Sequence, residues 1–285
     1  MEILKVAMIG DVMGDAGLEV LEKCLPLLFL QEQWPDFIMV NGENSANGFG
    51  INAEALSRML AAGVDVVSSG NHVWEKRDFW PLLESEKRVL RPANYADAPG
   101  RGCVKILKEI RGKRYAFLAV NLQGREFMNP IDCPFRCFDA IEKKQSEAPS
   151  VYTYPEPLNA NEAGTEKTFV LVDFHAESFR EKEAFGFYLD GRASVVAGTH
   201  THVQTADEKI LPKGTAYISD LGMCGITDAV IGMESKICID RARNQVLYRM
   251  EAAASGNRIL VQGILAEIDG ETGKALAIRR FSLGN

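Results

Sequence analysis

The chain has 285 residues, of which 46% are hydrophobic and 25% are charged, so it can bury a large core and has an ordinary globular composition. Its net charge of −7 argues against a protein that coats long nucleic acid, which is held mainly through Lys and Arg contacts to phosphates. A small anionic substrate stays open, because a metal ion can supply positive charge locally.

The N-terminal segment and the cysteines favour a cytoplasmic protein. The segment MEILKVAMIG enters a strand-like run at once and lacks the basic region and cleavage site of a signal peptide. The apolar run LPLLFL is too short to span a bilayer. The six cysteines are scattered, as expected in a reducing compartment, and we interpret Cys133 and Cys137 as free thiols because no second pair accompanies them as zinc ligands would require.

The first part of the chain alternates predicted strands and helices. Apolar, β-rich runs predict strands over Leu4–Ile9, Phe37–Val40 and Asp65–Ser68, and helical spacing predicts helices over Leu18–Leu30 and Ala53–Ala62. This repetition implies a largely parallel sheet covered by helices.

The middle of the chain breaks this regularity. Residues 122–167 are rich in Pro, Asn, Asp and Glu around one predicted helix at Phe138–Ser146, and we interpret them as an excursion that could form a lid within a single domain of residues 1–285. Regular patterns then return. They predict strands at Thr168–Phe174, Ala193–Ala197, Gln245–Ala253, Arg258–Ile268 and Ala275–Leu283, and a helix at Ser178–Leu189.

Side chains that can bind metal ions follow the predicted strands. They are Asp11, Glu43, Asn44, Asn71, His72, His175, His200 and His202, and they include all four histidines of the chain. In open α/β sheets the carboxyl ends of the strands share one edge, so we expect these residues to converge there. His200 and His202 are expected to face one way, as alternate residues of an extended segment.

Each of these residues has an ordinary explanation when it is taken alone. Asp11 can cap the following helix, Asn44 and Asn71 can be turn residues beside glycine, Glu43 can be a solvated carboxylate, and His175 can be a hydrogen-bonded core histidine. Their joint placement favours a metal site.

The ligand set predicts a pair of ions and a phosphodiester substrate. Two carboxylates, two amide oxygens and three imidazoles exceed what one tetrahedral ion needs. Two divalent ions, two carboxylates and a bridging hydroxide leave a charge of about +1, which suits a phosphodiester monoanion, and such ions activate the bridging water for in-line attack. His72, next to Asn71, is placed to donate a proton to the leaving oxygen.

At these residues the sequence resembles the calcineurin-like metallophosphoesterases. The matching blocks are Gly10-Asp11, Gly42-Glu43-Asn44, Gly70-Asn71-His72, His175 and Gly198-Thr199-His200-Thr201-His202. That superfamily usually has Asp-x-His and Gly-Asp in its first two blocks, whereas here Met13 and Glu43-Asn44 stand at those places. These departures match the YmdB-like 2′,3′-cyclic nucleotide 2′-phosphodiesterases, as do NGEN, GNHVW, RPAN, NLQGR, VDFHAE and the block from DGRASVV to ISDLGMCG.

This resemblance covers nearly the whole chain and implies a fold, a reaction and a ligand assignment. The implied fold is α/β, a two-sheet sandwich of metallophosphoesterase type with outer helices. The implied reaction is hydrolysis of 2′,3′-cyclic nucleotides to 3′-nucleotides, with two divalent or mixed-valence ions of iron or manganese. The implied ligands are Asp11, Glu43, Asn44 and His202 for one ion and Glu43, Asn71, His175 and His200 for the other, with Glu43 bridging and His72 catalytic.

Several alternatives accompany this interpretation. The enzyme alternative is a metal-dependent phosphomonoesterase or nuclease, and the binding alternative is a nucleotide-sensing regulator with incidental turnover. Gly10, Gly14 and Gly17 do not have the spacing of a dinucleotide-binding fingerprint, and no P-loop is present in the sequence. Arg125 and Asp220 are each explained equally well as pocket residues or as structural ones. The native metal, the base preference and the oligomeric state, including a homo-oligomer, stay open.

Overall fold

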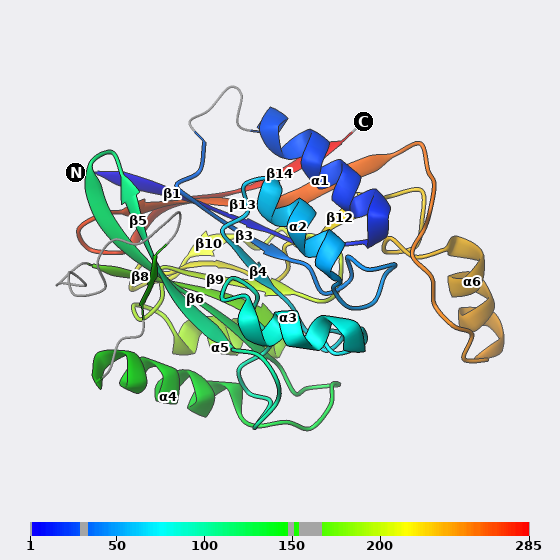
Figure 1. Cartoon of the computed structure of the whole chain (residues 1–285), viewed down its shortest axis with the longest axis horizontal. Coiled ribbons are helices and arrows are strands. Elements are labelled where there is room, and N and C mark those ends of the chain that lie inside the picture. Colours follow the sequence, from blue (N-terminus) through cyan, green and yellow to red (C-terminus); the bar gives the residue numbers. More distant parts are fainter. Residues whose placement is uncertain (1, 29–33, 148–150, 154–166, 285) are drawn as a thin grey trace.

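The computed structural model of the chain describes residues 2–28, 34–147, 151–153 and 167–284. In these residues the strands form two sheets that lie face to face with helices outside them (Figure 1). This arrangement confirms the predicted α/β sandwich with outer helices.

The first sheet combines strands from both ends of the chain. Its strand order is β2-β12-β13-β1-β3-β4, with β14 paired to β13. Its strands are β1 (Ile3–Ile9), β2 (Asp11–Val12), β3 (Phe37–Asn41), β4 (Val66–Ser68), β12 (Met223–Ile226), β13 (Ile259–Asp269) and β14 (Ala275–Gly284). Strands β1, β3 and β4 are parallel, whereas β13 runs antiparallel to β1 and β14.

The second sheet comes from the middle of the chain in the order β10-β11-β9-β8-β6-β5-β7. Its strands are β5 (Cys103–Ile110), β6 (Lys113–Gln123), β7 (Val151–Thr153), β8 (Thr168–His175), β9 (Val195–Thr199), β10 (Lys209–Ile210) and β11 (Ala216–Ile218). The neighbours β6, β8, β9 and β11 are parallel, so their carboxyl ends meet at one edge.

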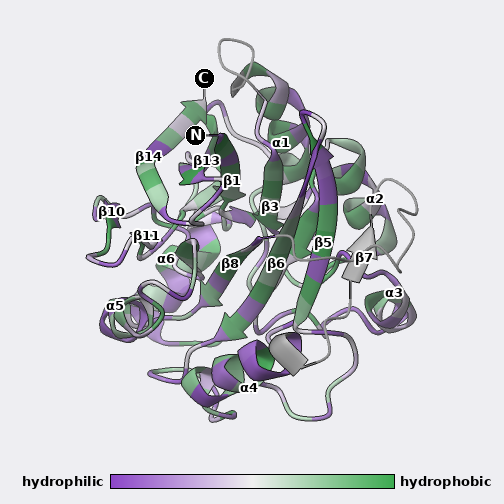
Figure 2. Ribbon diagram, turned by 90° about the vertical axis from the view of Figure 1, so that its left-hand side faces the viewer, coloured by the Kyte–Doolittle hydropathy of each residue, from purple (hydrophilic) through white to green (hydrophobic). Residues whose placement is uncertain are grey.

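Helices cover the outer faces of both sheets. Figure 2 shows α1, α2 and α3 on one side of the strands and α4 and α5 on the other. The helices are α1 (Gly14–Leu28), α2 (Ala53–Ala61), the 3₁₀ turn η1 (Arg77–Phe79), α3 (Trp80–Ser85), α4 (Pro134–Glu147), α5 (Phe179–Tyr188) and α6 (Ser235–Asn244), of which α6 lies away from both sheets. Side-chain caps begin three of them, because Asn52 accepts from the amide of Ala55, Ser178 from that of Glu181 and Glu234 from that of Lys236.

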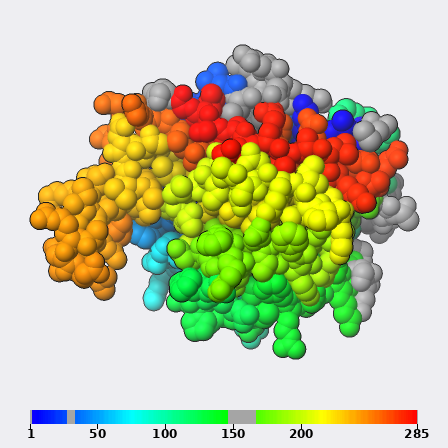
Figure 3. Space-filling model, turned by 180° about the vertical axis from the view of Figure 1, so that it is seen from behind, coloured from blue at the N-terminus to red at the C-terminus, as the bar shows by residue number. Residues whose placement is uncertain are grey.

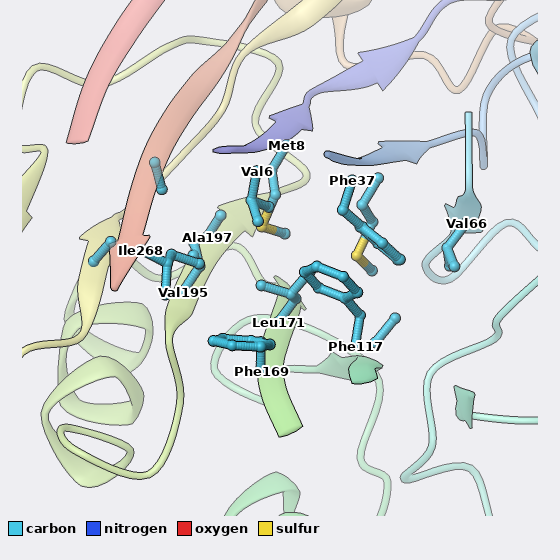
Figure 4. Close-up of a cluster of buried hydrophobic side chains, with 14 of the residues drawn as sticks. Val6, Met8, Phe37, Val66, Phe117, Phe169, Leu171, Val195, Ala197 and Ile268 are labelled. Carbon is cyan, nitrogen blue, oxygen red and sulfur yellow. The ribbon is translucent and has the colours of Figure 1, made fainter. Parts of the chain in front are cut away.

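The central core fills the space between the sheets. Figure 4 shows side chains of both sheets pointing toward one another, and Phe37 of β3 stacks on Phe117 of β6 with ring centroids 4.7 Å apart. A second apolar cluster joins the first sheet to α1 and α2, and a third joins the second sheet to Phe138 of α4 and Phe185 of α5. The long apolar runs of the sequence are therefore strands buried on both faces.

Most predicted elements are confirmed, but the structure also has elements that were not predicted, among them α3 and the strands β5, β6, β11 and β12. Three further differences concern α1, the segment after α6, and α6. α1 begins at Gly14, four residues before the predicted start, and residues 29–30 of that prediction lie outside the described residues. The predicted strand Gln245–Ala253 is wrong, because this segment is a mostly exposed connection after α6 that carries a single isolated bridge, from Ala252 to Met233. α6 itself was not predicted. None of its residues is buried in the structure.

The excursion at residues 122–167 contains α4, which begins four residues earlier than predicted and packs Phe138 against α5. Its role as a lid stays a prediction. In the part of the chain that the structure describes, no helix is both long and apolar enough to cross a bilayer.

Candidate metal centre

The predicted ligands lie where the carboxyl ends of both sheets meet. Directly behind them, polar side chains join the two sheets. Asn41 at the end of β3 donates to Asp173 of β8 at 2.9 Å, and Ser68 at the end of β4 donates to the same carboxylate at 2.5 Å. These buried bonds hold the two rows of strand ends together.

Four of the predicted residues form one group around His175. Its Nε2 atom lies 3.0 Å from Glu43 Oε1, 3.1 Å from Asn71 Oδ1 and 3.0 Å from His200 Nδ1. Ligand atoms of Glu43, His175 and His200 all lie within 4.8 Å of one another. One metal ion can therefore be reached by all of these side chains.

Three further residues form a second group beside the first. His202 Nε2 lies 3.1 Å from Asn44 Nδ2 and 3.8 Å from Asp11 Oδ1. Asn44 Nδ2 is also 3.4 Å from Glu43 Oε1, so that Glu43 stands between the groups. The two groups coincide with the two ligand sets that the resemblance implies, whereas ligation itself stays a prediction.

The three imidazoles each have one nitrogen held by a partner outside the cluster. His202 Nδ1 donates to the carbonyl of Ile231 at 2.9 Å, because a carbonyl can only accept. His200 Nε2 lies 3.1 Å from the carboxylate of Glu177. The remaining nitrogen of each ring faces the cluster, which is the orientation that metal-binding histidines have in proteins.

His175 is oriented through a hydroxyl group. Thr199 Oγ1 donates its one proton to Asp173 Oδ1 at 2.7 Å and lies 2.9 Å from His175 Nδ1. Since the proton of the hydroxyl is used, Thr199 must accept a hydrogen bond from His175 Nδ1. Nε2 of His175 is thereby directed toward Glu43 and Asn71.

Two buried oxygens of the cluster support a fit to cations. Asp11 and Asn44 are buried, and the atoms Asp11 Oδ1 and Asn44 Oδ1 have no hydrogen-bond partner among the described residues. Leaving a carboxylate or amide oxygen unpaired in the interior is costly, and a bound cation removes that cost. Oxygen and imidazole donors together suit first-row divalent ions.

Burial and neighbouring charges shift the pKa values of four residues of the cluster. Burial raises the pKa of Asp11 to about 7. Burial alone would raise the pKa of Glu43, but the neighbouring His175 lowers it to about 2. Burial also opposes protonation of His175, but the neighbouring Glu43 raises the pKa of His175 to about 9. Burial and the charge of His175 together lower the pKa of His200 to about 3. Glu43 thus favours positive charge on His175, which faces it.

The turn that carries His200 and His202 differs from the expected extended segment. Both residues have positive φ, 104° for His200 and 64° for His202, which is uncommon for residues other than glycine. The turn sends His200 to the first group and His202 to the second. Gly70 allows the close approach on the other side, because a Cβ there would lie 2.3 Å from both Glu43 Oε2 and His175 Nε2.

His72 lies beside the ligand groups rather than within them. Its backbone amide donates to Glu43 Oε2 at 3.1 Å, and its ring packs edge-on against Phe49. The side chain is 28% exposed and lines a cavity of about 910 Å³. The seven predicted ligands are not among the residues that line this cavity, so His72 lies between the cavity and the cluster.

The two undecided residues have structural partners. Asp220 is buried and accepts hydrogen bonds from Lys182 at 2.8 Å and from the backbone and hydroxyl of Thr201 at 3.1 and 2.8 Å. Arg125 lines a separate cavity of about 590 Å³, and its guanidinium contacts Cys133. Asp220 thus holds the 200–202 turn through its hydrogen bonds to Thr201. No described contact joins Arg125 to the ligands. All six cysteines, including Cys133 and Cys137, are free.

Sequence reasoning missed the residues that hold the ligands in place. They are Asn41, Asp173, Glu177 and Thr199. One signal was available, since Asp173 precedes His175 by two residues on a strand and therefore faces the same side. The contact of Glu177 with His200 has no comparable signal.

Comparisons with known proteins agree with this fold. A family model described as YmdB-like protein matches residues 7–281. The chain is 36% identical to the 2′,3′-cyclic-nucleotide 2′-phosphodiesterase of Bacillus subtilis (strain 168), over 99% of this chain and 98% of that protein. Two solved structures have the same fold. They are a hypothetical protein from Thermus thermophilus (TM-score 0.82, 36% identity, 99% of this chain and 100% of that one) and a novel phosphatase from Mycoplasma pneumoniae (TM-score 0.83, 28% identity, 100% and 94%).

Proposed function

The chain belongs to the YmdB-like protein family, and on this premise we propose that it is a phosphoric diester hydrolase that converts 2′,3′-cyclic nucleotides to 3′-nucleotides. The relative of that name in B. subtilis aligns with nearly the full length of this chain. The observation that carries the proposal is the pair of ligand groups joined by Glu43, with every imidazole directed inward by a partner outside the cluster.

These groups would hold two divalent ions, one in each ligand set. Asp11, Asn44 and His202 would hold one ion, and Asn71, His175 and His200 the other, with Glu43 shared. Such ions supply positive charge for the phosphoryl oxygens and lower the pKa of a bound water molecule. Iron and manganese are the metals we propose, since the oxygen and nitrogen donors suit both.

The chain's own residues orient the substrate and supply a proton. Hydrolysis breaks the bond from phosphorus to the 2′ oxygen, and this departing oxygen requires a proton. We assign its donation to His72, whose backbone amide contacts Glu43 and whose side chain lines the cavity. A cavity of about 910 Å³ can accept a mononucleotide, which agrees with a small substrate in place of long nucleic acid.

A cytoplasmic location is part of this proposal. All six cysteines are free, and a reducing compartment keeps thiols in that state.

The test begins with protein purified without added metal. Metal analysis should find about two ions per chain, and 2′,3′-cyclic AMP should be hydrolysed to the 3′-monophosphate faster than a phosphomonoester or a short RNA. A chelator should abolish the reaction, and Mn²⁺ should restore it. Full activity in a metal-free preparation would overturn the proposal, and preference for the monoester or RNA would favour the alternative enzyme.

Two variants with one matched control sharpen this test. Asp11→Asn should lose metal and activity, because it removes a ligand charge, whereas Asp65→Asn changes a buried carboxylate that binds Lys108 and should keep both. His72→Ala should keep the metal and lower kcat by about 10²- to 10⁴-fold, the contribution of a general acid. Unchanged kcat in His72→Ala would refute its role as the proton donor. Loss of hydrolysis in His72→Ala with an intact cellular phenotype would favour the nucleotide-sensing alternative.

A further inference from the structure

One wall of the cavity beside His72 comes from α6 and the segment that follows it. Figure 3 shows α6 as a separate lobe beside the body of the molecule. Arg241 of α6 and Tyr248 and Arg249 after it line the cavity, together with residues of the body such as His72. The cavity therefore lies between this lobe and the body.

This wall is fixed to the loops that carry the second ligand group. Ala252 packs against Gly14 and Gly48, since a Cβ at either glycine would lie 3.1 Å from the Cβ of Ala252. The amides of Gly14 and Gly48 both donate to the carbonyl of Asn44, at 2.9 and 3.0 Å. A molecule bound against the wall is thereby held at a fixed position relative to Asn44, one of the predicted ligands.

The cavity has room for more than the reacting end of a nucleotide. Its volume of about 910 Å³ is near the upper end of the range for small-molecule sites, roughly 300–1,000 Å³. None of the seven predicted ligands lines it, so a phosphate that reacts at those ligands lies outside this volume. His72 stands between the two, because its amide donates to Glu43 and its side chain lines the cavity. The volume is therefore available to the groups that a substrate carries beyond its reacting phosphate.

The charges of the lining indicate what those groups are. Lys76, Arg241 and Arg249 line the cavity, and none of them forms an ion pair with a carboxylate in the part of the chain that the structure describes. Unpaired cations around one cavity attract an anion, although the whole chain has a net charge of −7. The lining also has four carboxylates, on Asp15, Glu19, Glu75 and Glu251. Such a mixture suits one or two phosphates together with hydroxyl and amino groups, and it argues against a long polyanion.

Two aromatic side chains line the same cavity. The ring of Phe49 packs edge-on against His72, with ring centroids 4.8 Å apart. Tyr248 is 42% exposed, and its position is held by two hydrogen bonds, from Asn244 to its hydroxyl and from Arg241 to its carbonyl, both at 3.0 Å. Aromatic side chains beside basic ones are the groups with which proteins bind single-stranded nucleic acid, through stacked bases and paired phosphates.

We propose that the substrate of this enzyme is the 3′ end of a short oligoribonucleotide that terminates in a 2′,3′-cyclic phosphate. The phosphate that joins the last two nucleotides binds Arg249 and its neighbouring cations, and the base of the preceding nucleotide stacks on Tyr248. Such ends are supplied by RNA cleavage in which a 2′ hydroxyl attacks the adjacent phosphodiester.

This inference rests on the proposed function, because the cyclic phosphate is opened by the same reaction. One water is consumed: its hydroxide adds to phosphorus, and its proton replaces the one that His72 gives to the departing 2′ oxygen. Only the bond from phosphorus to the 2′ oxygen breaks, so the oligonucleotide keeps its length and ends in a 3′-monophosphate.

The decisive experiment compares two substrates on the full chain supplied with Mn²⁺. They are 2′,3′-cyclic AMP and the dinucleotide ApA that ends in a 2′,3′-cyclic phosphate. KM for the dinucleotide should be roughly 5- to 150-fold lower, the gain expected from one stacked base. KM for the dinucleotide should also rise more steeply with KCl concentration, because its binding includes an additional phosphate. Its sole product should be ApA with a 3′-monophosphate.

Variants of the wall identify the cavity as the binding site. In Arg249→Gln and in Tyr248→Ala, the ratio of KM for 2′,3′-cyclic AMP to KM for the dinucleotide should fall toward one. Because both constants come from one preparation, partial misfolding of a variant does not change this ratio. Arg243→Gln and Phe187→Ala are the matched controls, since both side chains are exposed and neither lines the cavity, and they should keep the wild-type ratio.

The outcomes separate this inference from the proposed function. Hydrolysis of 2′,3′-cyclic AMP with an equal or higher KM for the dinucleotide would overturn the inference and leave the proposed function standing. A wild-type ratio in Arg249→Gln and Tyr248→Ala would overturn it too, because the dinucleotide would then bind elsewhere. Hydrolysis of neither substrate, or cleavage between the two nucleotides of ApA, would overturn the proposed function itself and the inference with it.

Discussion

At the scale of single residues, the centre depends on side chains that never touch a ligand ion. The imidazoles of His175, His200 and His202 can face inward because Thr199, Glu177 and Ile231 hold their other nitrogens. The hydroxyl of Thr199 is oriented in turn by the carboxylate of Asp173, to which it donates. The same carboxylate accepts a hydrogen bond from Asn41 of the first sheet. Mutation of such outer partners commonly lowers metal affinity or activity.

Replacing Thr199 by valine should test this arrangement. Thr199→Val keeps the shape of the side chain and removes the acceptor for His175, so we expect the affinity for Mn²⁺ at one of the two sites to fall roughly 10- to 100-fold. Calorimetric titration of the metal-free protein measures this without reference to activity. In ¹⁵N NMR, His175 should lose its fixed Nδ1–H form.

The matched control is Thr215→Val, because Thr215 is equally buried and donates its hydroxyl proton to the carbonyl of Ala193, away from the ligands. Both variants should lose some stability, but Thr215→Val should bind Mn²⁺ as the wild type does. Equal affinities in all three proteins would show that Thr199 does not position His175.

At the scale of elements, the 200–202 turn is held against α5 by a buried ion pair. Lys182 of α5 and Asp220 are each only 2% exposed, and Asp220 also receives the backbone and hydroxyl of Thr201. The turn needs this support because its two histidines adopt positive φ, which the local sequence does not favour. α5 thus contributes to the site although it carries no predicted ligand.

Breaking this pair should be costly. Lys182→Met leaves the charge of Asp220 buried without its partner, so the free energy of unfolding should fall by about 3–5 kcal/mol, as measured by urea denaturation. Lys182→Met/Asp220→Asn should recover much of this loss, since no unpaired charge remains and the amide oxygen still accepts from Thr201.

The exposed pair of Lys209 and Glu183 provides the comparison. Lys209→Met should change the free energy of unfolding by less than about 1 kcal/mol, as for most surface pairs. A small loss in Lys182→Met as well would mean that Asp220 is not charged in the folded protein.

At the scale of the whole molecule, the site joins two sheets. Asp11, Glu43, Asn44 and Asn71 follow strands of the first sheet, and the three ligand histidines follow strands of the second. The apolar layer around Phe37 and Phe117 holds the sheets together from the inside, and the bond from Asn41 to Asp173 joins them near the site. Ions held by ligands from both sheets would therefore stabilise the entire fold.

Metal binding should accordingly raise the thermal stability of the protein. At a concentration of free Mn²⁺ about 100 times the dissociation constant, each site should add about 2.7 kcal/mol to the free energy of unfolding. Differential scanning calorimetry with and without chelator measures the change in Tm. Asp65→Asn should show the same increase as the wild type, and Asp11→Asn a smaller one; no increase in the wild-type protein would contradict the two-sheet arrangement of the ligands.

The sequence by itself determined the fold class, seven of the fourteen strands and four of the six α-helices that the structure describes, and the set of side chains at the strand ends. Apolar periodicity is a local property, and the edge at which parallel strands end follows from sheet geometry, so both could be inferred without coordinates. The convergence of His175 with Glu43 and Asn71 followed from the same rule.

Only the tertiary structure decided how these side chains are oriented and what surrounds them. The bend at His200 and His202, the contacts of Thr199 and Glu177, and the support from Lys182 depend on groups that meet only after the sheets have packed. The same reason explains the error at Gln245–Ala253, where apolar residues found no continuous strand to pair with. Hydrogen bonds and burial between distant segments determine such features, and a local pattern does not contain them.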